Sequence, residues 1–206
     1  MALQELQADS EYEVAALLTT VTEDYDRISM HGVRRALLQQ QAQSLGLPLA
    51  ELRLPKEVSN AAYDEKMSST LRRYKDDGVT GVAFGDIFLE DLRAYRERNL
   101  ARLQMQAIFP LWNRDPVSLL RSIIAGGFRA VTTCVDSKVL GREFVGRNID
   151  DAFISDLPAG VDVCGENGEY HSFVHNGPIF KEPIAHRRGE VVLRDDRFWY
   201  CDLIPG

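Results

Sequence analysis

A chain of 206 residues, 45% of them hydrophobic, is long enough for one full core, or for one domain with a small appendage. Its net charge of -7 argues against a nucleic-acid backbone or an anionic membrane as the main partner, so small molecules are the expected ligands. No apolar run approaches the length of a membrane span, and the first residues lack a signal-peptide layout, so we expect a cytoplasmic protein.

The cysteines and histidines predict no metal site. Cys134, Cys164 and Cys201 lie far apart and lack a C-x-x-C spacing, which is typical of free thiols in a reducing compartment. The histidines near the carboxyl terminus show no metal-ligand spacing either.

Short apolar runs alternate with amphipathic segments over the first two thirds of the chain. Runs that are short and β-branched predict strands, whereas apolar residues that recur every three to four positions predict helices. Residues 1–8 are rich in helix formers and predict a short helix. The predicted strands are residues 14–21, 47–54, 79–84, 105–112 and 128–135, and the predicted helices between them are residues 32–45, 60–77, 89–103 and 117–125.

Because strand and helix alternate with short connections, we expect an α/β fold with a parallel sheet and helices on both faces. After a predicted helix at residues 149–157, the pattern changes beyond residue 161 to short β runs, which predict a small antiparallel addition with its last hairpin turn at residues 194–197. The expected domains are a nucleotide-binding-type α/β domain, residues 1–137, and a substrate-binding α+β segment, residues 138–206.

Ligands of open parallel sheets bind outside the carboxyl ends of the strands. Asp86 is the best candidate there, because Gly85 lets the backbone approach a ligand closely while an acid directly follows the strand. Its structural alternative is an N-cap of the next helix. Arg93 and Glu97 lie four apart on that helix, where they either face the rim or form a surface ion pair. His31 is either a ligand contact or a helix-capping residue.

A second candidate site lies in residues 164–173, Cys-Gly-Glu-Asn-Gly-Glu-Tyr-His-Ser-Phe. Glu166 and Glu169 each follow a glycine, Gly165 and Gly168, so a tight turn can hold both carboxylates at a fixed separation. The alternative is a type I′ hairpin turn at Asn167-Gly168 with two solvated glutamates.

These segments resemble the diphthine-ammonia ligase family, a branch of the PP-loop ATP pyrophosphatases within the adenine nucleotide alpha hydrolase-like superfamily. Residues 165–170 resemble its Gly-Glu-Gly-Gly-Glu-Tyr motif, with Asn167 replacing one glycine, and residues 110–115 resemble its Pro-Leu-Trp-Gly-Arg-Asp motif, with Asn113 replacing glycine. The resemblance runs from about residue 12 to residue 182. Its other segments are residues 30–33, with His31, residues 84–87, which continue to Arg93, and residues 141–150, with Arg147.

The resemblance implies an enzyme that adenylates a carboxylate with ATP, releases pyrophosphate and lets ammonia form an amide from the acyl-adenylate. It implies that Glu166 and Glu169 orient the substrate or the ammonia as catalytic residues, and that Mg²⁺ neutralises the phosphates. The implied cofactor-binding residues are Gly85, Asp86, His31 and Arg93, and the implied substrate-binding residues are Gly165, Gly168, Tyr170, Arg114 and Arg147.

The family's protein substrate is a modified histidine of translation elongation factor 2. This short chain resembles the bacterial-type branch more closely, for which another carboxylate is expected, so the acceptor is either a protein or a small molecule. Nucleic-acid and membrane partners are not expected, and a homo-oligomer is compatible with the sequence.

One defining feature of the family is absent: residues 1–206 contain no Ser-Gly-Gly-Lys-Asp-Ser nucleotide loop and no strand before it. Either the chain is a truncated form of an active ligase, which we favour because the other motifs are intact, or it is a non-catalytic binding module. A further alternative is a related adenylating enzyme that acts on tRNA or on a small metabolite. We expect the chain as given to bind ATP poorly.

Overall fold

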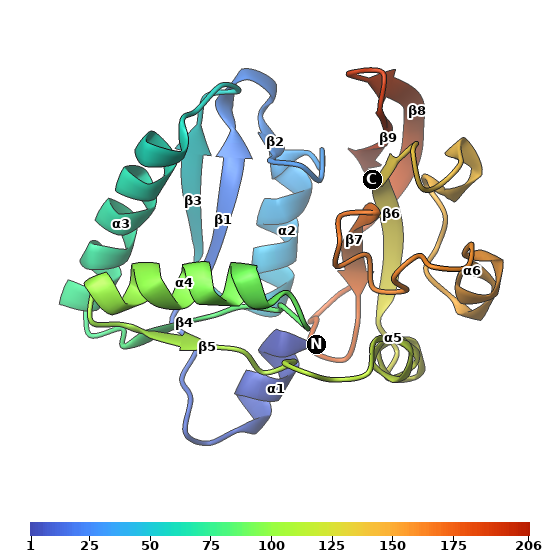
Figure 1. The fold of residues 1–206 in the computed structure, drawn as a ribbon. Coiled ribbons are helices and arrows are strands. Elements are labelled where there is room, and N and C mark those ends of the chain that lie inside the picture. Colours follow the sequence, from blue (N-terminus) through green and yellow to red (C-terminus); the bar gives the residue numbers. More distant parts are fainter.

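Two lobes lie side by side in the computed structural model, which describes residues 1–206 (Figure 1). The first lobe contains the parallel strands, and the second contains an antiparallel sheet of four strands. The fold is therefore of the predicted α/β class, with a small antiparallel part at the carboxyl end. No helix combines the length and the apolar composition that crossing a membrane requires.

Parallel pairing in the first lobe occurs in two separate pairs of strands. The first pair is β1 (Leu17–Thr22) with β3 (Leu49–Leu54), and the second is β4 (Gly81–Ala83) with β5 (Gln106–Ile108). No ladder joins the two pairs, and the short β2 (Arg27–Ile28) runs back antiparallel along the end of β1. The prediction of one continuous parallel sheet is wrong in this respect. The helices of this lobe are α1 (Ala2–Ala8), α2 (Arg35–Leu45), α3 (Asn60–Asp76) and α4 (Glu90–Arg102), with a 3-10 turn at Glu23–Tyr25.

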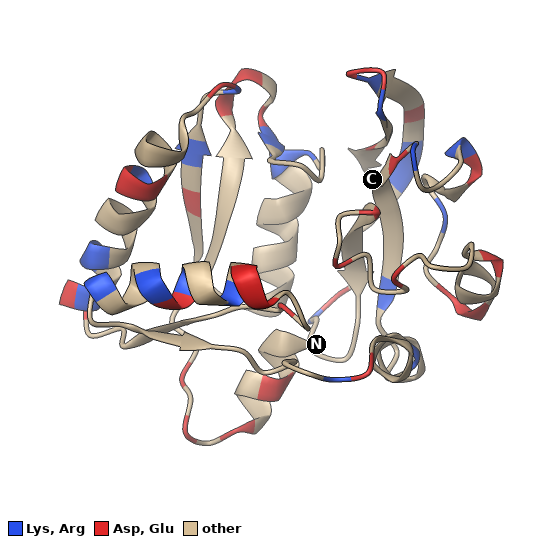
Figure 2. Cartoon of the chain, viewed as in Figure 1, with Lys and Arg blue, Asp and Glu red and all other residues tan.

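Side chains and glycine set the ends of the main helices. Gly46 closes α2 in the left-handed region, at φ 71°, where a residue without Cβ is favoured. The Ser59 side chain accepts a hydrogen bond from the Ala62 amide at the start of α3. Figure 2 shows acidic and basic residues interspersed along α3 and α4, so neither helix presents an uninterrupted basic face.

The second lobe is built around one antiparallel sheet with the strand order β7-β6-β9-β8. In Figure 1, α6 lies on the side of this sheet that faces away from the first lobe, and α5 lies below the end of the sheet, where its Leu119 packs with Ile87 and Leu111 of the first lobe. Asp195 and Asp196, both at positive φ, form the predicted last hairpin turn between β8 and β9. The elements are α5 (Pro116–Ala125), β6 (Arg129–Asp136), a 3-10 turn at Arg142–Phe144, α6 (Asp151–Asp156), β7 (Tyr170–Asn176), β8 (His186–Arg194) and β9 (Phe198–Pro205).

The predicted strand at residues 128–135 exists, but its assignment to the parallel sheet is wrong. It is β6, which pairs antiparallel with β7 and β9. Its last six residues are all buried, and a central antiparallel strand that is covered on both faces gives the same continuous apolar run as a parallel one. The expected domain boundary after residue 137 would place β6 in the first domain and its two partners, β7 and β9, in the second. We therefore propose that the second domain begins with α5.

The two lobes share one hydrophobic core. Fifteen buried residues form a single cluster, most of them in the second lobe, but Val33 and Leu37 come from the first. Figure 1 shows α2 between β1 and the antiparallel sheet, which explains this contribution. Polar contacts reinforce the junction: Asp202 of β9 accepts hydrogen bonds from Arg27 at 2.8 Å and from Arg34 at 2.6 Å. The two lobes therefore stabilise each other in the folded protein.

Candidate functional site

The segment before β7 reaches across to the loop that follows β4. The Ile87 amide donates a hydrogen bond of 2.7 Å to Oε1 of Glu166. This contact brings two predicted sites together, because Gly85 and Asp86 directly precede Ile87 while Gly165 directly precedes Glu166. The carboxyl end of β4 and the carboxylate-bearing loop of the second lobe thus form one candidate site.

Asp86 is held by a cation that the sequence analysis missed. Arg96 of α4 donates from Nε to one carboxylate oxygen at 2.5 Å and from Nη2 to the other at 3.1 Å. The Arg96 guanidinium also lies 4.1 Å from the centre of the Phe84 ring, so it is fixed from two sides. Asp86 is only 8% exposed. It does not cap α4, whose N-cap residue is Leu89, so the structural alternative for Asp86 is wrong.

Glu166 lies in an acidic environment. Burial raises the pKa of its carboxyl group, the hydrogen bond from the Ile87 amide opposes that shift, and the negative charges of Asp86 and Asp162 add to it. Arg96 partly offsets these charges. The site therefore holds three carboxylates against one guanidinium, an arrangement that favours a cationic ligand and a carboxylate able to accept a proton.

Glu169 points into the base of its own loop and is 6% exposed. Its Oε1 accepts hydrogen bonds of 3.0 Å from the Asp162 amide and from the side-chain amide of Asn167. Its Oε2 is buried and has no hydrogen-bond partner. A buried carboxylate oxygen without a partner is costly, so this atom is a candidate contact for a bound group.

The two glycines of the motif allow this loop geometry, with φ 70° at Gly165 and 86° at Gly168. A Cβ on Gly165 would meet the carbonyl oxygen of Tyr170 at 2.9 Å, so the position needs glycine. Residues 161–164 form no strand, and β7 pairs with β6, so the predicted strand there and the hairpin alternative for Asn167-Gly168 are both wrong. Loop closure by side chains, rather than strand pairing, shapes the segment.

Tyr170 supports the loop from below. Its ring is buried and its hydroxyl group donates to the Val163 carbonyl at 2.6 Å. Its predicted contact with substrate stays a prediction. The hydroxyl group is already bonded to the Val163 carbonyl within the loop.

The two predicted substrate-binding arginines lie in different places. Arg114 bonds to Glu5 of α1 at 2.8 Å, one residue after Asn113, whose amide donates to the Ile87 carbonyl at 2.8 Å. Arg147 bonds to Asp156 of α6 and lies over the rings of Phe144 and Phe153, within the second lobe. Only Arg114 is therefore next to the loop that Glu166 contacts.

His31 lies at the junction of the lobes. Its ring centre is 4.6 Å from that of His171 on β7, and burial lowers the pKa of both groups. It does not cap α2, whose N-cap residue is Arg34, so the capping alternative is wrong. The structure shows His31 as a contact between the two lobes.

Arg93 forms the predicted surface pair with Glu97 at 2.8 Å, but it also has aromatic neighbours. Its guanidinium lies 5.0 Å from the ring centre of Phe109 and 4.6 Å from that of Trp112. Asp86 bonds to Arg96 and not to Arg93. The three-residue spacing of the two arginines on α4 is the sequence signal that could have identified Arg96, because both face the same side of the helix.

Comparison with known proteins identifies the family to which this chain belongs. The structure defines an α/β protein whose candidate site lies at the carboxyl ends of parallel strands. The chain belongs to the diphthamide synthase family: the family model for the diphthamide synthase N-terminal domain matches residues 1–107, and the model for its C-terminal domain matches residues 115–203.

Three relatives named diphthine–ammonia ligase illustrate the similarity. The Danio rerio protein is 31% identical over 173 residues, which cover 75% of this chain and 67% of the relative. The Homo sapiens protein is 32% identical over 136 residues and the Mus musculus protein is 31% identical over 138 residues, in each case 63% of this chain and 51% of the relative. The matched part of this chain thus spans about half the length of the two mammalian relatives.

Proposed function

We propose that this chain acts as an ATP-dependent ligase that converts a carboxylate into an amide with ammonia. The names of the relatives support ligation of ammonia to diphthine, and the acceptor is then diphthine or another carboxylate. The observation that carries the proposal is the contact of Glu166 with the amide that follows Asp86, which joins an acidic loop to the rim of the parallel strands.

The reaction needs activation because a carboxylate is a poor electrophile. Attack of the carboxylate on ATP gives an acyl-adenylate and pyrophosphate. The nitrogen of ammonia then forms the amide bond, AMP leaves with the electrons of the broken acyl–oxygen bond, and one proton must be removed from nitrogen. Ammonium has no lone pair and cannot attack, so where ammonium is the species bound a second proton must be removed, and a site that attracts ammonium therefore needs a base beside it.

Glu166 fits both requirements. Its neighbours Asp86 and Asp162 give the site a negative potential that attracts ammonium, and its raised pKa makes it a better proton acceptor than an ordinary surface glutamate. Glu169 contributes its unpartnered oxygen to the orientation of the acceptor or of the ammonia. Arg96 holds Asp86 in place and offers positive charge beside the strand end.

The residues fit Mg²⁺ only together with a bound nucleotide. The structure contains no group of three or more His, Cys, Asp or Glu side chains arranged to hold a metal ion. Mg²⁺ is commonly bound by one or two carboxylates together with phosphates, whose charge it neutralises, and Glu166 is the carboxylate best placed to assist. Asp86 fits this role less well, because both of its oxygens bond to Arg96.

The ammonia half of the reaction gives a direct test. Residues 1–206 are mixed with acetyl-adenylate and ammonium chloride, and the acetamide and AMP formed are measured by chromatography. We expect the protein to accelerate acetamide formation, and the substitution Glu166→Gln to slow it by about 10²- to 10⁴-fold, the usual contribution of a general base. This half-reaction does not require ATP binding.

Glu65→Gln is the matched control, because Glu65 is an exposed acid on α3 without a partner in the site. We expect the control to keep the rate of the unmodified protein. Equal rates of acetamide formation with and without protein would contradict the proposed role in amide formation.

A further inference from the structure

Asp162, just before the glycine–acid motif, bonds to both of its glutamates. The Asp162 backbone amide donates to Oε1 of Glu169 at 3.0 Å, and its Oδ2 accepts from the Glu166 amide at 2.8 Å. Its carbonyl also accepts from the Gly165 amide at 3.0 Å. A residue that the sequence analysis did not single out thus uses its amide, its carbonyl and its carboxylate to shape the loop.

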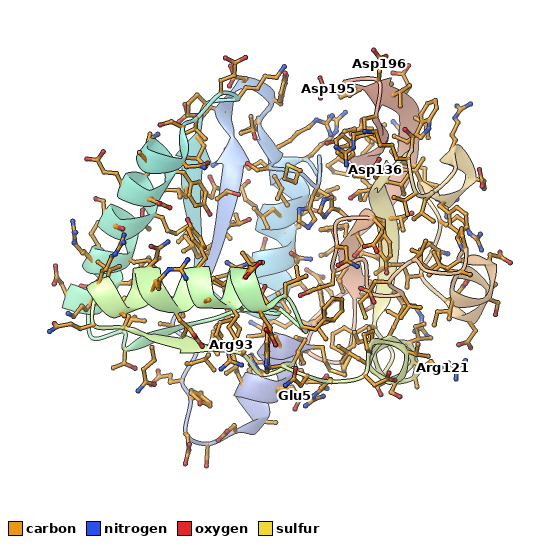
Figure 3. The ribbon with its side chains drawn as sticks, viewed as in Figure 1. Glu5, Arg93, Arg121, Asp136, Asp195 and Asp196 are labelled. Carbon is orange, nitrogen blue, oxygen red and sulfur yellow. The ribbon has the colours of Figure 1, made fainter.

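The loop is also fixed to the sheet of the second lobe, independently of the Asp162 carboxylate. The Tyr170 hydroxyl group donates to the Val163 carbonyl at 2.6 Å. The Glu169 carbonyl accepts from the Asp136 amide at 2.9 Å, and Figure 3 labels Asp136, the last residue of β6. We therefore expect loss of the Asp162 carboxylate to disturb the two glutamates more than the sheet that carries them.

Each glutamate keeps one carboxylate oxygen without a hydrogen-bond partner in the protein. In Glu166 the oxygen that accepts a hydrogen bond is Oε1, from the Ile87 amide at 2.7 Å. In Glu169 the unpartnered oxygen is the buried Oε2. Because Asp162 holds Glu169 through a backbone donor and Glu166 through a side-chain acceptor, the separation of the two remaining oxygens depends on Asp162.

The negative charge of Asp162 is not needed for these hydrogen bonds. An asparagine oxygen accepts from an amide equally well and does not repel a neighbouring carboxylate. Burial is the main cause that raises the pKa of Glu166, and the charges of Asp86 and Asp162 add to it, against Arg96. Cys164 adds no charge, because burial and the neighbouring acids raise the pKa of its thiol to about 12. The acid at position 162 therefore favours proton uptake by Glu166.

We propose that Asp162 is a positioning residue of the candidate site, which sets the separation of Glu166 and Glu169 through its hydrogen bonds and makes Glu166 a stronger base through its negative charge. Its effect on a reaction rate rests on the proposed ligase function, whereas its effects on the position and the titration of Glu166 do not. Two substitutions separate its contributions: Asp162→Asn keeps the acceptor and removes the charge, and Asp162→Ala removes both.

The rate of acetamide formation is measured between pH 5 and pH 8, and each variant is compared with the unmodified protein at the same pH, so that the ionisation of ammonium cancels. We expect Asp162→Ala to be slower by about 100-fold at pH 8, the usual cost of a misplaced catalytic group. Asp162→Asn should be slower by only about 2- to 10-fold at pH 8, as expected for a weaker base. The rate of Asp162→Asn relative to the unmodified protein should rise as the pH falls, because its Glu166 stays deprotonated to a lower pH.

Two measurements test the proposal without turnover. Carboxyl-carbon NMR titrates Glu166, whose signal is identified by its absence in Glu166→Gln, and we expect a lower pKa in Asp162→Asn. Hydrogen exchange of the Glu166 amide should be slow in the unmodified protein and at least about tenfold faster in Asp162→Ala, because Asp162 is its acceptor. If the alanine variant fails to fold, protection of this amide in the unmodified protein still tests the bond.

Asp151→Asn is the matched control, because Asp151 is an exposed acid on α6 without a partner in the candidate site, and it should keep both the rate and the Glu166 titration. An unchanged Glu166 titration in Asp162→Asn, or an unprotected Glu166 amide in the unmodified protein, overturns the proposal whether or not the chain is a ligase. If both NMR results are as expected but the unmodified protein forms no acetamide, the positioning role stands and the proposed function fails.

Discussion

The two lobes differ in how they are stabilised. The largest cluster, of fifteen buried residues, lies mostly in the second lobe, whereas the first lobe has a cluster of four, and a third cluster of three joins the loops after β4 and β5 to α5 of the second lobe. The candidate site lies where the loops of these two lobes meet, at Ile87 and Glu166. The comparison suggests that the second lobe, together with α2, sets the stability of the molecule, and that the parallel strands are held in place by their attachment to it.

The largest expected effect is in the core of the second lobe. Phe153 has no exposed surface and packs edge-to-face against Phe144 and Tyr170. We expect Phe153→Ala to lower the free energy of unfolding by about 3–5 kcal/mol, the usual range for such a truncation. Leu103→Ala, in the four-residue cluster of the first lobe, provides the comparison and should cost less. Urea denaturation of both variants measures the difference, and an equal loss would mean that the lobes are equally well packed.

The next effect concerns the shared core. Leu37 of α2 is fully buried in the large cluster. We expect Leu37→Ala to cost about 2–5 kcal/mol and to lower the stability of both lobes together. Trp112 lies in the first lobe and Trp199 in the second, so single-tryptophan variants report each lobe by fluorescence. Separate unfolding transitions for the two reporters would show that α2 does not couple the lobes.

A pH-dependent effect arises from three partly buried histidines, of which His31 and His171 lie at the junction of the lobes and His175 lies within the second lobe, against His186. Burial lowers the pKa of His31, and it lowers the pKa of His171 and His175 to about 4. These groups are neutral in the folded protein where the unfolded chain binds protons, so stability should fall as the pH drops from about 6.5 toward 4. Each of the two groups with a pKa near 4 should cost on the order of 2 kcal/mol between pH 7 and pH 5, so we expect a total loss on the order of 4 kcal/mol.

The measurement is urea denaturation at a series of pH values. His171→Gln should reduce the slope of stability against pH, because one of the depressed groups is removed. A slope that is unchanged in this variant would place the proton uptake elsewhere in the molecule.

The sequence predicted the local elements and the two halves of the site better than their assembly. Asp86 and Glu166 could each be identified from a glycine–acid pattern, but their meeting depends on a packing of lobes that no local pattern encodes. Arg96 was missed because α4 carries charged residues all along its length, so the three-residue spacing from Arg93 does not by itself single out this arginine. β6 was assigned to the parallel sheet because burial on both faces, which the sequence does show, does not reveal the direction of the neighbouring strands.

The smallest effect on stability is expected for Glu166. A substitution there also best distinguishes a role in the chemistry of the candidate site from a role in holding the two lobes together. Its pKa is raised in the folded protein, so any stability that it contributes is present at low pH and is lost as the pH rises through that value. Glu166→Gln keeps an oxygen that accepts from the Ile87 amide and removes the repulsion from Asp86 and Asp162.

We therefore expect Glu166→Gln to leave the free energy of unfolding at pH 7 unchanged or higher by up to about 1 kcal/mol, while it slows acetamide formation. Urea denaturation at pH 7 and at pH 4 measures the first quantity, and the gain should shrink at the lower pH, where the unmodified glutamate is itself protonated. A variant that loses both stability and activity would identify Glu166 as a structural link between the lobes. A variant that gains stability and loses activity would show that the Glu166 carboxylate destabilises the folded protein and is needed for the reaction.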